Sequence, residues 1–215
     1  LGTYEIMDRL TKAFPNILFE NCSGGGGRFD PAMLYYSPQI WASDNTDPIE
    51  RLYIQFGTSM CYPSSTMGAH VSACDRTGYK TKGNVALWGT FGYELDPLKL
   101  TDSDREIIKE QVKLYHNTYD LIRYRLVSPF ENPYRAVWEI VSPDKSRAML
   151  TVVTMRGECA PHTIVKLRGL EPQRYYRNEK TGETYSGALL MNAGLNLTYT
   201  ANNDGDSELL IFTAI

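Results

Sequence analysis

The first 125 residues alternate short apolar runs with segments of helical periodicity. Ile6, Leu10 and Phe14 recur at every fourth residue, which predicts an amphipathic helix from Thr3 to Phe14 that Pro15 closes. The predicted strands of this region are Ile17–Glu20, Gln39–Ser43, Met67–Ser72 and Thr90–Leu95. Further helices are predicted from Pro48 to about Met60, near Asn84–Trp88 and from Asp102 onward. Strand and helix alternating four times predict a parallel α/β fold.

Two of these helix starts carry recognisable capping signals. Asp47 directly precedes Pro48, which combines an N-cap side chain with proline in the first helical turn. Thr101 stands three residues before Asp104, which resembles a capping box with Asp in place of the usual Glu. Both positions are therefore predicted to begin helices.

Beyond Arg125 the pattern changes to short strands separated by turn signals. The predicted strands are Trp138–Val141, Ala148–Thr154, Thr163–Leu167, Arg174–Arg177, Leu195–Thr200 and Leu209–Thr213. The segment contains no helical pattern of useful length, and this predicts an antiparallel β-sandwich over residues 126–215. The chain is thus predicted to have two regions, an α/β region of residues 1–125 and an all-β region of residues 126–215.

The α/β region is too short to form a complete barrel. A (β/α)₈ TIM barrel takes about 250 residues and eight strands, so four strands in 125 residues correspond to half of one. The alternative is a small open doubly wound sheet, which usually has a glycine-rich nucleotide loop after its first strand.

Composition excludes several classes of protein. The 215 residues (24.3 kDa) are 42% hydrophobic and carry a formal net charge of −3, which is ordinary for a globular chain. No apolar run reaches 18 residues, the first ten residues lack signal-peptide features, and no basic stripe exists, so neither a membrane nor a nucleic acid is an expected partner. The four cysteines form no CxxC pair, which argues against a zinc site and a disulfide scaffold and fits a reducing cytoplasm. No metal or other cofactor is predicted.

A run of four glycines after Asn21-Cys22-Ser23 is the strongest local feature. It lacks the Gly-Lys-Ser/Thr of a phosphate loop and the spacing of a dinucleotide fingerprint. Either it is a loose strand-to-helix connection, or its backbone closely approaches a small polar ligand, which glycine permits because it has no Cβ. The second interpretation is favoured.

The segment Trp41-Ala42-Ser43-Asp44-Asn45-Thr46-Asp47 places two carboxylates three residues apart. Asp47 is accounted for as a helix cap, whereas Asp44 follows the carboxyl end of a predicted strand, where barrel enzymes place their catalytic groups. Burial beside Trp41 and a second carboxylate nearby would raise the pKa of Asp44, as a general acid requires. The competing interpretation is a solvated loop aspartate.

The histidines offer less. His70 ends a predicted strand, where it either lines a site or is a buried, hydrogen-bonded core residue, and no metal-ligand spacing joins it to His116 or His162.

Three blocks together resemble the bacterial α-galactosidases of glycoside hydrolase family 36. They are the run from Phe14 to Pro63, which contains ENCSGGGGRFDP and WASDNTDP, the segment MGAHVSA from Met67 to Ala73, and GTFGYELD from Gly89 to Asp96. The resemblance extends more loosely into the β region, so it covers essentially the whole chain.

The resemblance implies a specific fold. It implies that residues 1–125 are the C-terminal half of a catalytic (β/α)₈ TIM barrel and that residues 126–215 are a C-terminal antiparallel β-sandwich. It also implies hydrolysis, with retention of configuration, of terminal α-D-galactosyl residues in raffinose-type oligosaccharides.

The resemblance also assigns site residues and partners. The acid/base of the family falls on Asp44, and the galactose contacts of its Cys-Ser-Gly-Gly motif fall on Cys22 and Gly24. Apart from the resemblance, Trp41 is expected to be a further substrate contact because it flanks Asp44 in the sequence. The expected partners are a galactoside substrate and the N-terminal portion of the same enzyme, and the complete enzyme is expected to be a cytoplasmic homo-oligomer.

The chain departs from the family pattern at two places. The Lys-Trp-Asp motif that holds the nucleophile is not among the 215 residues, and the segment from Leu121 to Val127 is shorter than usual near Tyr124. We therefore expect the chain alone to be inactive and its unpaired strand edges to bind an N-terminal portion, oligomerise or aggregate. A non-catalytic sugar-binding or assembly fragment and a transglycosylase of the same family remain alternatives.

Overall fold

The computed structural model describes residues 2–73, 76–121, 134–156, 164–197 and 203–215. The α/β region contains α1 (Gly2–Ala13), β1 (Glu20–Asn21), α2 (Pro31–Tyr36), β2 (Gln39–Trp41), α3 (Pro48–Ser59), the 3₁₀ turn η1 (Ser64–Thr66), β3 (Met67–Ser72), α4 (Tyr79–Ala86), β4 (Thr90–Glu94), the 3₁₀ turn η2 (Pro97–Lys99) and α5 (Asp102–Thr118). The β region contains β5 (Arg135–Val141), β6 (Arg147–Thr154), β7 (Ile164–Val165), β8 (Tyr175–Asn178), β9 (Thr184–Ser186), α6 (Gly187–Asn192), β10 (Leu195–Asn196) and β11 (Ser207–Ala214).

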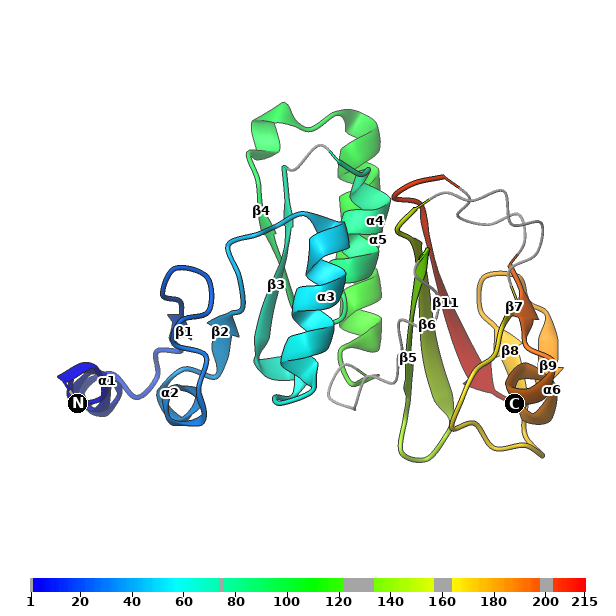
Figure 1. Ribbon diagram of the computed structural model, residues 1–215, viewed down its shortest axis with the longest axis horizontal. Coiled ribbons are helices and arrows are strands. Elements are labelled where there is room, and N and C mark those ends of the chain that lie inside the picture. The colour runs from blue at the N-terminus through cyan, green and yellow to red at the C-terminus, as the bar shows by residue number, and fades with distance from the viewer. Residues whose placement is uncertain (1, 74–75, 122–133, 157–163, 198–202) are drawn as a thin grey trace.

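The α/β region is built on a four-stranded parallel sheet in the order β1-β2-β3-β4. Each strand pairs with the next one along the chain, and all three pairings are parallel. Helices α3, α4 and α5 stand between this sheet and the antiparallel sheet of the β region (Figure 1). The predicted parallel α/β arrangement is thus confirmed, and all four strands present their carboxyl ends on one edge.

The helix starts follow the capping chemistry of the sequence. The Asp47 carboxylate accepts hydrogen bonds from the backbone N–H groups of Ile49 (2.9 Å) and Glu50 (3.1 Å), so the predicted N-cap is confirmed. The capping box of Thr101 and Asp104 is also confirmed, since each side chain accepts from the other's backbone N–H.

Two predictions in this region are wrong in detail, and one helix was not predicted. The first strand is only Glu20–Asn21, and Leu18 is 82% exposed, so the apolar run before it is not a buried strand. Helix α4 begins at Tyr79 rather than near Asn84. Helix α2 was not predicted, although Asp30 caps it and Pro31 opens it, the same signal that marks α3.

The β region contains a five-stranded antiparallel sheet in the order β5-β6-β11-β8-β9, with the antiparallel pair β7–β10 in a second layer. The predicted antiparallel character is confirmed in the part of the chain that the structure describes. Helix α6 and strand β9 were not predicted, because both are too short to show a period.

Both faces of the five-stranded sheet are covered at strands β5, β6 and β11. Strand β6 is therefore buried at seven successive positions, Ala148–Thr154, instead of alternating with exposed residues. One face packs on the second layer in a core that includes Leu150, Tyr176, Leu190 and Phe212. The other face packs on helices α3, α4 and α5, so one hydrophobic core joins the two regions.

Trp88 lies at the centre of this shared core. Its indole ring stands edge-on to that of Trp138, with centroids 5.6 Å apart, and its Nε1–H donates to Thr151 Oγ1 at 2.9 Å. The Ser207 hydroxyl adds polar contacts with Thr81 Oγ1 (2.7 Å) and Asn84 Nδ2 (2.9 Å). The β region therefore fixes α4, the helix that leads into β4 and one wall of the site described below.

Some sequence predictions fall outside the described residues. The boundary between residues 125 and 126 and the shortened segment near Tyr124 lie within residues 122–133, and Cys74 and Cys159 also lie in undescribed segments. Cys22 and Cys61 are free and exposed. Among the helices that the structure describes, none is long and apolar enough to cross a membrane.

Candidate active site

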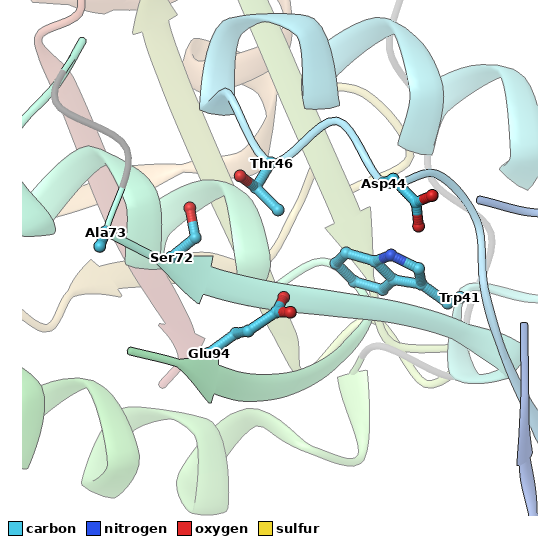
Figure 2. A pocket seen from close by; sticks show the side chains of 6 residues that line it. All are labelled: Trp41, Asp44, Thr46, Ser72, Ala73 and Glu94. Atoms are coloured by element: carbon cyan, nitrogen blue, oxygen red, sulfur yellow. The ribbon is translucent and has the colours of Figure 1, made fainter. Parts of the chain in front are cut away.

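A pocket of about 460 Å³ opens at the carboxyl ends of β2, β3 and β4. Figure 2 shows the side chains that line it, which are Trp41, Asp44, Thr46, Ser72, Ala73 and Glu94. Ligand sites of α/β proteins form at this edge because the strands end there and the following loops are free to carry polar side chains. Of the residues predicted from sequence, Trp41 and Asp44 line this pocket.

The loop after β2 is held by a ladder of short side-chain-to-backbone hydrogen bonds. Ser43 Oγ accepts from the Asn45 N–H (3.1 Å), Asn45 Oδ1 accepts from the Asp47 N–H (3.0 Å), and Asp47 caps α3. The intervening side chains, Asp44 and Thr46, line the pocket instead. Alternate residues of the Ser-Asp-Asn-Thr-Asp motif thus shape the loop or face the pocket, which separates the roles of its two aspartates.

The Asp44 carboxylate is solvent-exposed within the described residues. The second carboxylate expected beside it, that of Asp47, instead bonds the start of α3 and pairs with Arg76 Nη1 at 3.2 Å. The expected burial of Asp44 is therefore not provided by β2, β3 and β4 alone. Its place at the pocket mouth nevertheless suits proton exchange with a bound molecule.

Trp41 is a buried residue of the pocket wall, and two neighbours fix its ring. The imidazole of His70 stacks on it with centroids 4.4 Å apart and planes 21° apart, and the Arg51 guanidinium carbon lies 4.5 Å from the indole centroid. A Cβ at Gly68 would come within 3.0 Å of the ring, so β3 needs a residue without a side chain there. Trp41 is thus held rigidly in the pocket wall.

His70 lies behind this wall rather than in the pocket lining. It is half-buried, and its Nδ1 is 3.8 Å from a carboxylate oxygen of Glu94, which extends from the end of β4 toward the loop that carries Thr46 (Figure 2). The sequence predicted that His70 either lines a site or is a buried core residue, and neither describes this position fully. His70 supports Trp41, a lining residue, without lining the pocket itself.

Part of the glycine run lies against another segment of the chain and does not face open space. Gly24, Gly25 and Gly26 all have positive φ angles of 56°, 71° and 100°. A Cβ at Gly25 would lie 2.5 Å from the backbone nitrogen of Asp44, and one at Gly26 would lie 2.4 Å from the Ala42 carbonyl oxygen. These two glycines therefore let the loop after β1 lie directly against the segment that carries Asp44.

Cys22 and Gly24 face solvent at the carboxyl end of β1. A Cβ at Gly24 would have no atom within 4 Å, so the backbone there is open to a ligand, unlike that at Gly25. Neither Cys22 nor Gly24 is among the lining residues of the pocket, and their contact with a sugar stays a prediction.

Sequence reasoning missed Thr46, Ser72, Ala73 and Glu94 as lining residues. The last three stand at or just beyond the ends of predicted strands, which was the available signal. In the part of the chain that the structure describes, no group of three His, Cys, Asp or Glu side chains is placed to hold a metal ion.

Two family models match the chain. Residues 1–125 match the Melibiase model, and residues 135–212 match the model of the glycosyl hydrolase family 36 C-terminal domain.

The chain is also similar to characterised proteins along most of its length. It is 48% identical over 214 residues to alpha-galactosidase AgaA of Geobacillus stearothermophilus, covering 94% of this chain and 29% of that protein. It is 49% identical over 208 residues to the bifunctional alpha-galactosidase/sucrose kinase AgaSK of Mediterraneibacter gnavus, covering 92% and 22%. A crystal structure of an AgaA variant in complex with raffinose superposes with a TM-score of 0.93, covering 100% of this chain and 31% of that one. The chain thus spans less than a third of the length of these relatives.

Proposed function

The chain belongs to glycoside hydrolase family 36, the melibiase family, and on this premise we propose that it is the C-terminal part of a retaining α-galactosidase. Its substrates would be terminal α-D-galactosyl residues of raffinose-type oligosaccharides. The observation that carries the proposal is the exposed Asp44 carboxylate beside the fixed Trp41 ring, in a pocket at the carboxyl edge of a parallel sheet. On this proposal residues 1–125 form the second half of the catalytic barrel and residues 126–215 its β-sandwich domain.

In the proposed reaction Asp44 is the acid/base. A nucleophilic carboxylate from another part of the enzyme attacks the anomeric carbon while the carboxylic acid of Asp44 gives its proton to the departing glycosidic oxygen. Asp44, now ionised, takes a proton from water as the water oxygen bonds to the anomeric carbon and releases the nucleophile. Trp41, Cys22 and Gly24 would contact the galactosyl unit.

The partners follow from this division of the active site. The Lys-Trp-Asp motif of the nucleophile is not among the 215 residues, and we propose that an N-terminal portion of the enzyme supplies it. We propose that the 215 residues alone have no turnover on an aryl α-galactoside and that the complete enzyme is a cytoplasmic homo-oligomer. A transglycosylase would use the same residues and differs only in whether water or a sugar hydroxyl accepts the galactosyl group.

Two substitutions in the complete enzyme test the assignment of Asp44. Asp44→Ala should fold normally and lose raffinose hydrolysis by roughly 10²–10⁴-fold, because the sugar leaving group needs protonation. It should retain more activity on aryl galactosides with acidic phenols. When deglycosylation limits the rate, azide should raise the turnover of aryl galactosides by Asp44→Ala, since an anionic nucleophile needs no general base.

Asp47→Ala is the matched control, because it removes a carboxylate three residues away that caps α3. It should lower the free energy of unfolding by about 1 kcal/mol and so lower the melting temperature. Azide should not raise its turnover. If azide instead raises the turnover of Asp47→Ala and leaves that of Asp44→Ala unchanged, the assignment is inverted and Asp47 is the acid/base.

A further inference from the structure

Arg51 is a buried cation directly beneath the loop that carries Asp44. It is the fourth residue of α3, and only 2% of its surface is exposed. Its Nε donates to Gln55 Oε1 at 3.1 Å, its Nη1 to the Ser43 carbonyl at 3.1 Å, and its Nη2 to the Gly68 carbonyl at 2.6 Å. Its guanidinium also lies over the ring of Trp41. One side chain therefore joins α3, the loop after β2, and β3.

Packing requirements alone do not account for a charge at this position. All partners that the described residues give Arg51 are uncharged, namely two carbonyls, an amide and an aromatic ring. Burial lowers the pKa of Arg51 to about 10, because removal from water penalises the charged form. A well-packed apolar residue is often as stabilising as a buried charge, so stability is a weak reason for an arginine here.

The contacts of Arg51 converge on the two pocket residues that sequence analysis singled out. The Ser43 carbonyl belongs to the peptide that leads into Asp44, so its bond to Nη1 restrains the backbone from which the Asp44 side chain projects. The Gly68 carbonyl belongs to the β3 residue that packs against Trp41. The planar fork of arginine serves both acceptors at once, which the single ammonium of lysine does not reproduce.

We propose that Arg51 is a positioning residue for the acid/base: it fixes Asp44 and Trp41 relative to each other by bridging the loop after β2 to β3. The inference rests on the proposed function of Asp44. Its effect on the reaction passes through Asp44, since the guanidinium is buried behind the pocket wall and does not line the pocket. A displacement of Asp44 by about 1 Å is enough to cost on the order of 10²-fold in rate.

A double-mutant cycle in the complete enzyme tests this. Arg51→Met, Asp44→Ala and the double variant are compared by kcat/KM on raffinose and on an aryl galactoside with an acidic phenol. Arg51→Met should lower kcat/KM for raffinose by roughly 10–100-fold and that for the acidic aryl galactoside by less than about 3-fold, because only the sugar leaving group needs the proton. In the Asp44→Ala background the same substitution should cost less than about 3-fold, because a residue acting through Asp44 has nothing left to position.

Two further variants keep the test decisive. Arg135→Met removes another buried arginine, on β5 in the β region, and should leave the ratio of the two kcat/KM values unchanged. Arg51→Lys retains the charge without the fork and serves where Arg51→Met does not fold. It should show the same dependence on the leaving group with a smaller loss.

Equal losses on both substrates, or a full additional loss in the Asp44→Ala background, would mean that Arg51 only supports the fold and would overturn the inference. Failure of the proposed function is read separately, from the Asp44→Ala single variant. If that variant hydrolyses raffinose normally, Asp44 is not the acid/base, and the inference falls with it.

Discussion

The two regions of the molecule differ in strand length and in how completely their elements are buried. In the α/β region the strands are two to six residues long, α1 buries none of its residues, and Ile6, Ile17 and Leu18 are more than half exposed. In the β region β5, β6 and β11 are seven or eight residues long, and these three strands are covered on both faces. The pocket lies in the less completely buried region, whose helices α3, α4 and α5 pack on strands β5, β6 and β11.

This arrangement gives each region a separate task. The helices α3 and α4 pack on the five-stranded sheet, and the loop before α3 presents Asp44 and Thr46 to the pocket at the carboxyl ends of β2, β3 and β4. A rigid scaffold behind a polar loop is the usual way to hold reactive groups in place. Three substitutions test how far this division of tasks holds.

The largest effect is expected at Trp88, in the core that joins the two regions. Trp88→Ala should lower the free energy of unfolding by about 3–5 kcal/mol, because it leaves a cavity between α4 and the five-stranded sheet. Urea unfolding of the chain, followed by circular dichroism, measures the loss. Leu98→Ala is the control, since Leu98 is 87% exposed in the α/β region and should change stability by less than about 0.5 kcal/mol.

A similar loss of stability in Trp88→Ala and Leu98→Ala would contradict this comparison of the two regions, because it would mean that the shared core does not hold the α/β region in place. Trp88→Phe sharpens the result. It keeps most of the ring volume and removes the hydrogen bond to Thr151, so its cost should fall well below that of Trp88→Ala.

The second effect is a pH dependence that originates in the β region. Glu139 is buried on β5, and its carboxylate accepts the backbone N–H of Arg168 at 2.8 and 3.0 Å. Burial raises its pKa from 4.5 to about 8, although the Arg168 N–H and charge lower it in part. The folded state therefore binds a proton more tightly than the unfolded state, and stability should fall as the pH rises from about 4.5 to about 8.

Glu139→Gln removes this titration while keeping an oxygen acceptor for Arg168. Each pKa unit corresponds to about 1.4 kcal/mol, so the variant should be more stable than the parent chain at pH 8 by an amount on the order of a few kcal/mol. The difference should shrink toward pH 4.5. Urea unfolding at several pH values measures it, with exposed Glu106→Gln as the control, and a constant difference across the range would contradict the assignment to Glu139.

The smallest effect compares two neighbouring glycines of the loop after β1. Both Gly24 and Gly25 have positive φ, so an alanine at either position costs about 1 kcal/mol in backbone strain. Only at Gly25 does the added Cβ also meet the backbone nitrogen of Asp44. Gly25→Ala should therefore destabilise the chain by about 1 kcal/mol more than Gly24→Ala and displace Asp44.

Thermal unfolding and the raffinose kcat/KM of the complete enzyme measure the two consequences. Equal stability losses would mean that the loop moves away from Asp44 without cost, and the close approach of the two segments would then have no structural role.

Much of the molecule could be predicted because its signals are local in the chain. The periodicity of residues 3–14, the caps at Asp47 and Thr101, and the turn signals beyond Arg125 each involve residues within a few positions of one another. The placement of Asp44 and Trp41 at the carboxyl edge of a parallel sheet followed from the same strand-and-helix alternation. The sequence alone thus determined the two classes of region and two of the six pocket residues.

The remaining features depended on contacts between residues far apart in the chain. The sequence showed neither that the glycine run lies against the Asp44 segment nor that the Arg51 side chain bridges Ser43 and Gly68, because no periodic pattern encodes which loops meet. The continuous burial of β6 likewise has its cause in helices far from it in the chain, α3, α4 and α5, which cover the face that an isolated sheet would leave to water. Only the tertiary structure decided these features, since close packing selects among the many loop placements that the local sequence permits.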